Sequence, residues 1–401
     1  MTERLYYDDA YRVDFSGTVL DVREDARGFL VQMDRSAFYP TSGGQPYDTG
    51  TLGGAQVLDV FVDQAGEVIH LLDRALTPGQ VACGHVDWAR RFDHMQQHAG
   101  EHMLAGVLYT VLGGHTIGLH LGEDVSTIDV ELPGGQMRVS RATLDEIEER
   151  VNRQIQQDLP IRCWFPTEQE LLDAPVRKPP TVKSHIRLVQ VGDVECVACG
   201  GTHPSATGQI GLIKVLDARP SRGKMRVTFV CGLRATRDYQ ARFHACEDAC
   251  ASLSTGVPAL PEAVLKVLKR LHEAERALKD LQMQGALAQA EALLSRATRL
   301  SDGWRAVCAV LDELDQAALV ELGTHLAQSG RTYALLSSGE ADARLVFCAS
   351  PEARVPMGAL LSRVVKPLGG KGGGRADLAQ GAGPGRASLQ AALSLLELPG
   401  I

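Results

Sequence analysis

The sequence predicts a multidomain α+β protein, and three patterns support this class. Apolar and polar residues alternate between turn signals over residues 1–80, helical periodicity follows after residue 90, and strand and helix patterns alternate again after residue 300. A chain of 401 residues is long enough for two or three domains of roughly 100–200 residues each. Hydrophobic residues make up 44% of the chain, which excludes a disordered or fibrous protein because a core of ordinary size can be buried.

Residues 1–88 are expected to form a small β-barrel. The runs 17–23, 29–33 and 57–62 alternate apolar and polar side chains and are separated by glycines and other turn residues. Residues 1–80 carry 13 Asp and Glu against six Arg and no Lys, a net charge of −7, so most of the total of −8 lies here. This acidity excludes nonspecific binding of nucleic acid over the whole surface, although it leaves room for local basic patches.

Residues 89–250 are expected to form an α+β domain. Helical patterns run from Arg90 to about Leu112 and from about Leu144 to Asp158, and Ser140 or Thr143 is suited to cap the second helix. Strand-like runs follow at residues 186–191, 210–215 and 226–231. We therefore expect one β-rich sheet with helices on one side.

Residues 251–302 are predicted to be a helical linker, and residues 303–401 a compact α/β domain. Apolar residues recur along the linker at spacings of 3, 4, 3, 4 and 3, namely at Val264, Val267, Leu271, Ala274, Leu278 and Leu281. This heptad pattern fits either one half of a helical hairpin or a dimerising coiled coil. The last domain holds eight glycines between residues 369 and 385, which we interpret as a glycine-rich loop.

The sequence favours a cytoplasmic protein with reduced cysteines. Its first residues do not combine a basic segment with an apolar run, so no signal peptide is predicted. No apolar stretch approaches the roughly 18–20 residues that span a bilayer, so no membrane partner is expected. Nine cysteines, an odd number spread over a long chain, favour free thiols over a disulfide framework.

The strongest chemical signal is a pair of short motifs. His98-Ala-Gly-Glu-His102 lies on the first predicted helix, where residues four apart share a face. Cys199-Gly-Gly-Thr-His203 combines a thiol and an imidazole around two glycines that allow a tight turn. Together the four side chains would make a tetrahedral site of three nitrogens and one sulfur, which suits one Zn²⁺ per chain.

Other ligands and another enzyme class remain open at this point. His94 precedes His98 by four residues, and Cys196 precedes Cys199 by three, so either could replace a ligand. The first motif also fits the His-x-x-Glu-His pattern of inverted zinc proteases, with Glu101 as general base. The protease alternative needs a third ligand from a downstream helix and gives Cys199 no role. Loss of metal binding in Cys199→Ala would therefore favour the four-residue site over the protease site.

These motifs resemble those of the editing domain of alanyl-tRNA synthetases. The run His98-Ala-Gly-Glu-His-Met-Leu104 resembles the helix that carries its first two metal ligands, and residues 199–203 with 207–211 resemble its second metal motif. Residues 38–50 are similar to the preceding barrel segment, and residues 369–381 to the glycine-rich signature of the C-terminal domain. No aminoacylation domain fits before residue 38, so the chain resembles a freestanding alanyl-tRNA editing protein of the long type.

The resemblance implies an aminoacyl-tRNA hydrolase. Such a protein removes serine, and in many members glycine, from mischarged tRNA(Ala), because a synthetic site sized for alanine cannot strongly reject either amino acid. The resemblance assigns Zn²⁺ to His98, His102, Cys199 and His203. No catalytic residue is assigned, and Glu101 is expected to be solvated or to lie behind the ligands. The alternative from another class is a non-catalytic tRNA-binding module with a structural zinc.

The resemblance also indicates substrate and RNA contacts. Thr116 lies about where the family uses a threonine to bind the seryl hydroxyl, Thr202 is a second candidate, and His120 stands where this chain departs from the synthetase pattern. Basic residues gather at 177–187 and 219–242. In the glycine-rich domain the predicted tRNA contacts are Lys366, Lys371 and Arg375. Residues 258–300 or the C-terminal domain are the candidate interfaces of a homodimer.

Overall fold

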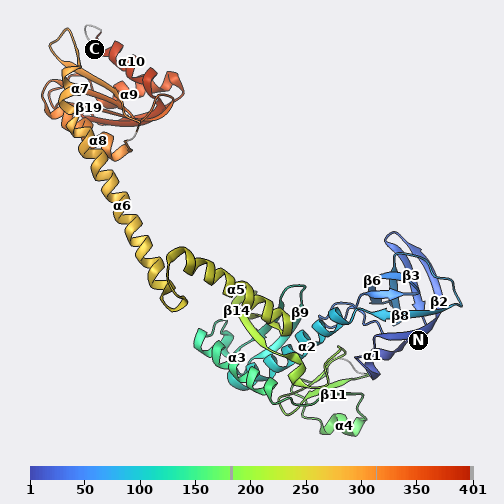
Figure 1. The fold of residues 1–401 in the computed structure, drawn as a ribbon. Coiled ribbons are helices and arrows are strands. Elements are labelled where there is room, and N and C mark those ends of the chain that lie inside the picture. Colours follow the sequence, from blue (N-terminus) through green and yellow to red (C-terminus); the bar gives the residue numbers. More distant parts are fainter. Residues whose placement is uncertain (181–183, 313, 398–401) are drawn as a thin grey trace. The chain divides into compact units, whose positions relative to one another are not determined.

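The computed structural model describes residues 1–180, 184–312 and 314–397, which form two compact units, Met1–Asp248 and Ala249–Ile401. The first unit contains a β-barrel followed by a mixed α and β region, and the second contains a six-stranded sheet (Figure 1). Helix α5 (Gly232–Leu253) crosses the boundary between the units. Among the described residues, no helix combines the length and the apolar character needed to cross a membrane.

The predicted N-terminal barrel is confirmed and has six strands. In pairing order they are β2 (Asp14–Asp25), β3 (Gly28–Met33), β7 (Val68–Leu72), β6 (Ala55–Val62), β5 (Gly50–Leu52) and β8 (Val81–Val86). Alternate residues of β8 are exposed and buried, as a strand of a small barrel requires. The short parallel strands β1 (Glu3–Arg4) and β4 (Arg35–Ser36) pair outside the barrel, and α1 (Leu5–Asp8) follows β1.

Helix α2 (Trp88–Leu112) is the central element of the first unit. Asp87 caps its N-terminus by accepting hydrogen bonds from two backbone amides, and Gly113 ends it in the left-handed region at φ 65°. Every residue from His94 to Leu108 is buried. Helix α3 (Arg141–Gln156), capped by Ser140, packs against α2 through its apolar face. Polar side chains in the middle of α2 are therefore held inside the protein.

Two antiparallel sheets, rather than the single sheet expected, accompany α2. The four-stranded sheet has the order β14 (Ile213–Ser221), β15 (Lys224–Cys231), β10 (Ser126–Glu131) and β9 (His115–Leu121). The three-stranded sheet consists of β11 (Ile161–Trp164), β12 (Leu188–Val191) and β13 (Glu195–Ala198). The loop after β13 and the turn η2 (Thr207–Ile210) lie between β13 and β14 along the chain. The remaining short elements are η1 (Pro133–Gly135) and α4 (Glu168–Asp173).

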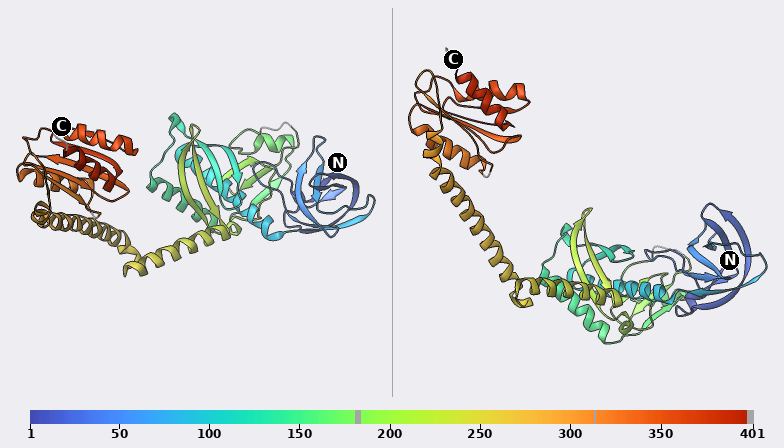
Figure 2. Two further views of the ribbon diagram at one scale, coloured as in Figure 1. Left: turned by 90° about the horizontal axis from the view of Figure 1, so that it is seen from above. Right: turned by 45° about the horizontal axis from the view of Figure 1, so that its top comes forward.

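The second unit is a mixed sheet with helices on both faces (Figure 2). The strand order is β16 (Thr298–Arg299), β17 (Arg305–Val310), β18 (Thr332–Ser337), β19 (Asp342–Ala349), β21 (Leu378–Pro384) and β20 (Lys371–Gly374). Strand β18 is buried throughout; Leu335 packs with α9 (Met357–Val365) and α10 (Gly385–Leu396), and Leu336 packs with α8 (Gln316–Gln328). The other helical elements are η3 (Val257–Ala259), α6 (Leu260–Ala288), α7 (Ala290–Ser295) and η4 (Lys366–Leu368).

The glycine-rich stretch is a β-hairpin and not the loop that we expected. Strands β20 and β21 pair in antiparallel register, with Gly372 opposite Gly381. A Cβ added to Gly358 on α9 would lie 2.2 Å from the carbonyl oxygen of Gly374. The glycines thus allow the backbones of a helix and an edge strand to touch, which no larger residue permits.

The heptad residues of α6 are exposed. Their exposed fractions include 42% for Val264 and 65% for Leu281. None of these heptad residues belongs to a core cluster of the described residues, although the C-terminal end of α6 packs with α8 through Ala286 and Leu287. The hairpin interpretation stays a prediction, and so does the dimerising coil.

Candidate metal centre

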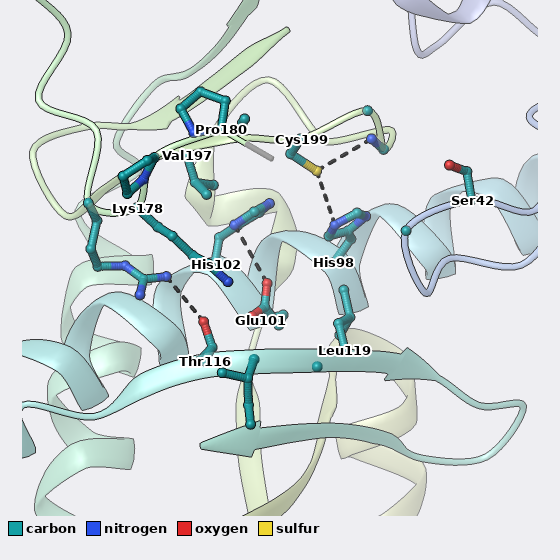
Figure 3. Close-up of a pocket in the computed structure, with 18 of the residues that line it drawn as sticks. Ser42, His98, Glu101, His102, Thr116, Leu119, Lys178, Pro180, Val197 and Cys199 are labelled. Atoms are coloured by element: carbon teal, nitrogen blue, oxygen red, sulfur yellow. Dashed lines mark hydrogen bonds and ion pairs between the residues drawn. The ribbon is translucent and has the colours of Figure 1, made fainter. Parts of the chain in front are cut away.

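The four predicted ligands converge on one point. His98 and His102 come from successive turns of α2, Cys199 and His203 come from the loop after β13, and their ligand atoms all lie within 4.8 Å of one another (Figure 3). The Sγ atom of Cys199 is 3.3 Å from Nε2 of His98 and 3.8 Å from Nε2 of His203. Nε2 of His102 is 3.1 Å from Nε2 of His203. Tetrahedral zinc bonds would separate such atoms by about 3.3–3.7 Å.

The protonation states of these groups suit a metal ion. Burial lowers the pKa of His98 to about 3 and holds the pKa values of His102 and His203 well below 6.5. All three rings are therefore neutral, which is the form that binds metals. Burial raises the pKa of Cys199 to about 12, so its thiolate needs a cation beside it. The four residues could thus hold a metal ion.

A glutamine of the barrel orients His98. Gln45 lies between β4 and β5, is fully buried, and accepts a hydrogen bond from Nδ1 of His98 at 2.8 Å. Its Oε1 also accepts from the amide of Thr202 at 3.2 Å, and its Nε2 donates to Oγ1 of Thr202 at 2.8 Å. A partner on Nδ1 leaves the lone pair of Nε2 directed at the cluster. No motif marks Gln45 in the sequence, and its only signal is its place in residues 38–50.

Glu101 is buried beside His102, and it is one of the residues that line the cavity next to the four side chains. Its Oε2 is 3.6 Å from Nδ1 of His102, and 9% of its side chain is exposed. Burial raises the pKa of Glu101 to about 8. The solvated position considered from sequence is therefore wrong for this carboxylate. Sγ of Cys163 lies 4.0 Å from Nδ1 of His203.

A cavity of about 300 Å³ adjoins the cluster. Figure 3 shows Ser42, Thr116, Leu119, Lys178 and Val197 around the space beside His98, His102 and Cys199. Its wall therefore combines the barrel loop, α2, β9, β13 and the chain before β12. A ligand bound in this cavity would lie against the imidazoles and the thiol.

A β-bulge brings Thr116 to the cavity. Leu119 pairs with Ile128 and Thr116 pairs with Val130, so β9 has one residue more than β10 over this interval. The extra residue reverses the alternation of faces, and both Thr116 and Leu119 line the cavity. His120 is exposed and is not among the residues that line it. The structure therefore brings Thr116 to the site but does not bring His120 there.

The other sequence candidates near the site are buried. Thr202 is fully buried and bonded to Gln45, and it does not line the cavity. His94 and Cys196, the alternative ligands, are buried as well. Neither belongs to the group of metal-ligating atoms found among the described residues.

Two of the basic residues at 177–187, Arg177 and Arg187, are held inside the protein, whereas Lys178 is exposed. Arg177 pairs with Glu195, and the buried Arg187 donates to the carbonyl oxygens of Cys199 and Gly201 at 3.0 and 2.9 Å. Arg187 thereby fixes the turn that carries the thiol ligand. Lys183 falls outside the described residues.

Ion pairs neutralise much of the second basic cluster. Four of its arginines have acidic partners: Arg219 with Asp217, Arg226 with Asp129, Arg234 with Asp93 and Arg242 with Asp238. In the second unit Lys366, Lys371 and Arg375 are exposed, and Arg375 lies 3.1 Å from Asp377. Their role in RNA binding stays a prediction.

Two family profiles match the chain. The Threonyl and Alanyl tRNA synthetase second additional domain matches residues 186–227, and the DHHA1 domain matches residues 305–398. A solved structure, the C-Ala domain from Aquifex aeolicus alanyl-tRNA synthetase, is 28% identical and covers 25% of this chain and 95% of that one. Its TM-score of 0.24 is too low to support a structural argument.

Curated relatives cover nearly the whole chain. The alanyl-tRNA editing protein AlaX-L of Pyrococcus horikoshii is 29% identical, over 95% of this chain and 94% of that protein. The alanine–tRNA ligases of Pyrococcus furiosus and Halobacterium salinarum are 31% and 34% identical, over 95% and 98% of this chain. The chain spans only 42% and 43% of those ligases. It is therefore a homologue of the alanyl-tRNA editing protein AlaX-L, related to the editing and C-terminal regions of alanyl-tRNA synthetases.

Proposed function

We propose that the chain deacylates tRNA(Ala) mischarged with serine, and also with glycine. The observation that carries this proposal is the His and Cys cluster beside a cavity that Thr116 lines. Support comes from the homologue AlaX-L, which is an alanyl-tRNA editing protein and matches this chain over almost its full length. A separate hydrolytic site is the usual remedy where a synthetic site cannot reject a similar amino acid.

We propose one Zn²⁺ per chain, held by His98, His102, Cys199 and His203. Three neutral imidazoles and a thiolate are ligands that zinc prefers, and the distances between their atoms fit a tetrahedral arrangement. When bound, zinc supplies Lewis acidity that polarises an ester carbonyl or lowers the pKa of water. Gln45 keeps the ring of His98 in the ligating tautomer.

The reaction is hydrolysis of the ester between the amino acid and the terminal adenosine. A water oxygen bonds to the ester carbon, the bond from that carbon to the ribose oxygen breaks, and the ribose oxygen takes a proton. The cavity wall holds the aminoacyl group beside the cluster, and positioning of this kind supplies much of the rate enhancement for a reactive ester. The hydroxyl of Thr116 contacts the seryl hydroxyl, whereas a glycyl ester is bound without that contact.

The other parts of the chain serve the RNA. We retain the division into a barrel (1–88), an editing domain (89–250), a helical linker (251–302) and a C-terminal domain (303–401). Lys366, Lys371 and Arg375 are exposed cations beside a glycine hairpin, which suits contacts with phosphates. A homodimer through residues 258–300 or the C-terminal domain is the remaining partner prediction.

A deacylation assay tests the proposed function. Zinc-loaded protein is incubated with seryl- and glycyl-tRNA(Ala), and loss of the amino acid is compared between the intact chain, His98→Ala and His244→Ala. The exposed His244 lies outside the site and serves as a matched histidine control. We expect hydrolysis by the intact chain and the control, and at least a hundredfold loss in His98→Ala. If the zinc-loaded intact chain hydrolyses neither ester, the proposed function is wrong.

A second candidate function is tRNA binding with a purely structural metal. Four protein ligands close a tetrahedral site, as in structural zinc sites, and this observation favours that candidate. It predicts tRNA binding without hydrolysis in the same assay. The protease alternative, by contrast, leaves Cys199 and His203 without a role although both belong to the cluster.

A further inference from the structure

Arg177 is a charged side chain inside the site with no role in the proposed metal chemistry. It lines the cavity beside the cluster, and only 9% of its side chain is exposed. Its Nη1 atom is buried and has no hydrogen-bond partner among the described residues. A buried donor without an acceptor is costly, so this position needs an explanation.

Three contacts of its side chain and backbone hold Arg177 in place. Its Nε donates to both carboxylate oxygens of Glu195, at 3.0 and 2.7 Å, and the carboxylate is fully buried. Its Cζ lies 5.7 Å from the centre of the Tyr109 ring. The backbone amide of Arg177 also donates to the carbonyl oxygen of Cys196 on β13 at 3.0 Å. The arginine is therefore anchored to the same strand that leads into the ligand Cys199.

The free end of this guanidinium reaches Thr116. Nη2 of Arg177 donates to Oγ1 of Thr116 at 3.2 Å, and Figure 3 marks this bond. Arginine has five donors and no acceptor, so the hydroxyl proton of Thr116 cannot be donated back to it. No described residue accepts that proton either. The O–H bond of Thr116 is thus left free for a ligand in the cavity.

We propose that Arg177 is a positioning residue that sets the preference for an aminoacyl ester with a side-chain hydroxyl. By occupying one lone pair of Thr116, it fixes the threonine hydroxyl as a donor toward the seryl oxygen. Glu195 holds Arg177 in place, and β13 ties this arrangement to the metal-binding loop. The inference rests on the proposed function, because it explains how the same site distinguishes serine from glycine.

A double-mutant cycle tests whether Arg177 acts through Thr116. The measured quantity is the ratio of kcat/KM for seryl-tRNA(Ala) to kcat/KM for glycyl-tRNA(Ala), in the intact chain, Arg177→Gln, Thr116→Val and the double variant. We expect Arg177→Gln to lower the ratio about tenfold, as loss of one charge-assisted hydrogen bond does. Thr116→Val should lower it at least as much, and the double variant no further than Thr116→Val alone.

Two results would overturn the inference. One is a ratio that stays within twofold of the intact chain in Arg177→Gln. The other is a double variant in which the two factors multiply, because Arg177 would then act independently of Thr116. Arg162→Gln is the matched control, since it removes an exposed arginine from the three-stranded sheet outside the cavity.

Folding and turnover are controlled separately. Arg177→Gln leaves Glu195 buried without its cation, so Arg177→Gln with Glu195→Gln provides an uncharged pair, and zinc content and circular dichroism check each variant. If the intact chain hydrolyses neither ester, the proposed function fails. Binding of non-hydrolysable seryl- and glycyl-amide analogues of adenosine then decides the inference. A seryl preference that disappears in Arg177→Gln supports it, whereas an equal preference in both proteins overturns it.

Discussion

Gln45 connects the barrel to His98 by a hydrogen bond, so a substitution of Gln45 tests whether this bond supports metal binding. Gln45→Leu keeps the size of the side chain but removes three hydrogen bonds, one to Nδ1 of His98 at 2.8 Å and two to Thr202 at 2.8 and 3.2 Å. Without its partner the imidazole of His98 can rotate or change tautomer. Thr202 loosens at the same time, and it directly precedes the ligand His203.

The structure gives the size of the expected effect. Each lost hydrogen bond costs a net free energy of about 1 kcal/mol. Because the bonds to His98 and Thr202 contribute only in part to zinc binding, we expect the binding free energy to weaken by about 1.4–2.8 kcal/mol. That range corresponds to a Kd for zinc about 10–100 times larger. The ligands themselves are unchanged, so the variant should still bind one zinc ion, but more weakly.

Competition between the protein and a chromophoric chelator measures this Kd. Gln45→Glu keeps an acceptor for Nδ1 of His98 and should bind zinc more tightly than Gln45→Leu. Gln56→Leu changes an exposed glutamine of the same barrel and serves as the control. A zinc Kd for Gln45→Leu within twofold of the intact chain, in a variant that is folded by circular dichroism, would refute this account.

Three further predictions concern stability. Arg91→Met should lower the free energy of unfolding in urea by about 3–5 kcal/mol, because it leaves the fully buried Asp48 without its cation. Burial lowers the pKa of His70 from 6.5 to about 4, so the unfolded chain takes up the proton first as the pH falls. Stability should therefore be full above pH 6.5 and should decrease by about 3 kcal/mol toward pH 4, and His70→Gln should remove this contribution. Gly358→Ala should destabilise the second unit by about 1–3 kcal/mol, measured by hydrogen exchange, because its Cβ meets the backbone of Gly374.

Each of these predictions has a matched control. The control for Arg91→Met is Arg74→Met, which changes an exposed arginine of the barrel. An equal decrease in the free energy of unfolding in both variants would contradict the first prediction. The control for His70→Gln is the same substitution at the exposed His85. If stability depends on pH in His70→Gln as it does in the intact chain, the second prediction is wrong. The control for Gly358→Ala is Gly373→Ala, where the nearest atom to an added Cβ is 3.8 Å away. Similar exchange rates in the two glycine variants would count against the third.

The cluster of four side chains was predictable because short-range geometry brings its members together in pairs. Helical periodicity alone puts His98 and His102 on one face, and the paired glycines allow Cys199 and His203 to turn toward a common point. The barrel followed from alternation in the same way. These signals act over a few residues, so they survive in the sequence whatever surrounds them.

The supporting residues depend on contacts between distant segments. Gln45 is 53 residues from His98, and Arg177 reaches Thr116 across 61 residues, so no local pattern marks either pair. Arg177 and Arg187 looked like surface cations, yet buried partners hold both inside the protein. Glycine usually disfavours strands, so the glycine-rich stretch predicts a loop, whereas close packing against a helix requires glycine in this hairpin.

The spacing of the ligands along the chain has a consequence for how the first unit folds. Cys199 and His98 are 101 residues apart, and so are His203 and His102. A metal ion shared by these pairs would act as a cross-link that closes a loop of about 100 residues, which in a disulfide is worth about 4–5 kcal/mol of chain entropy. All four residues could hold the ion only after α2 and the loop after β13 had met. Full metal binding would then require that these two distant segments of the chain had already come together.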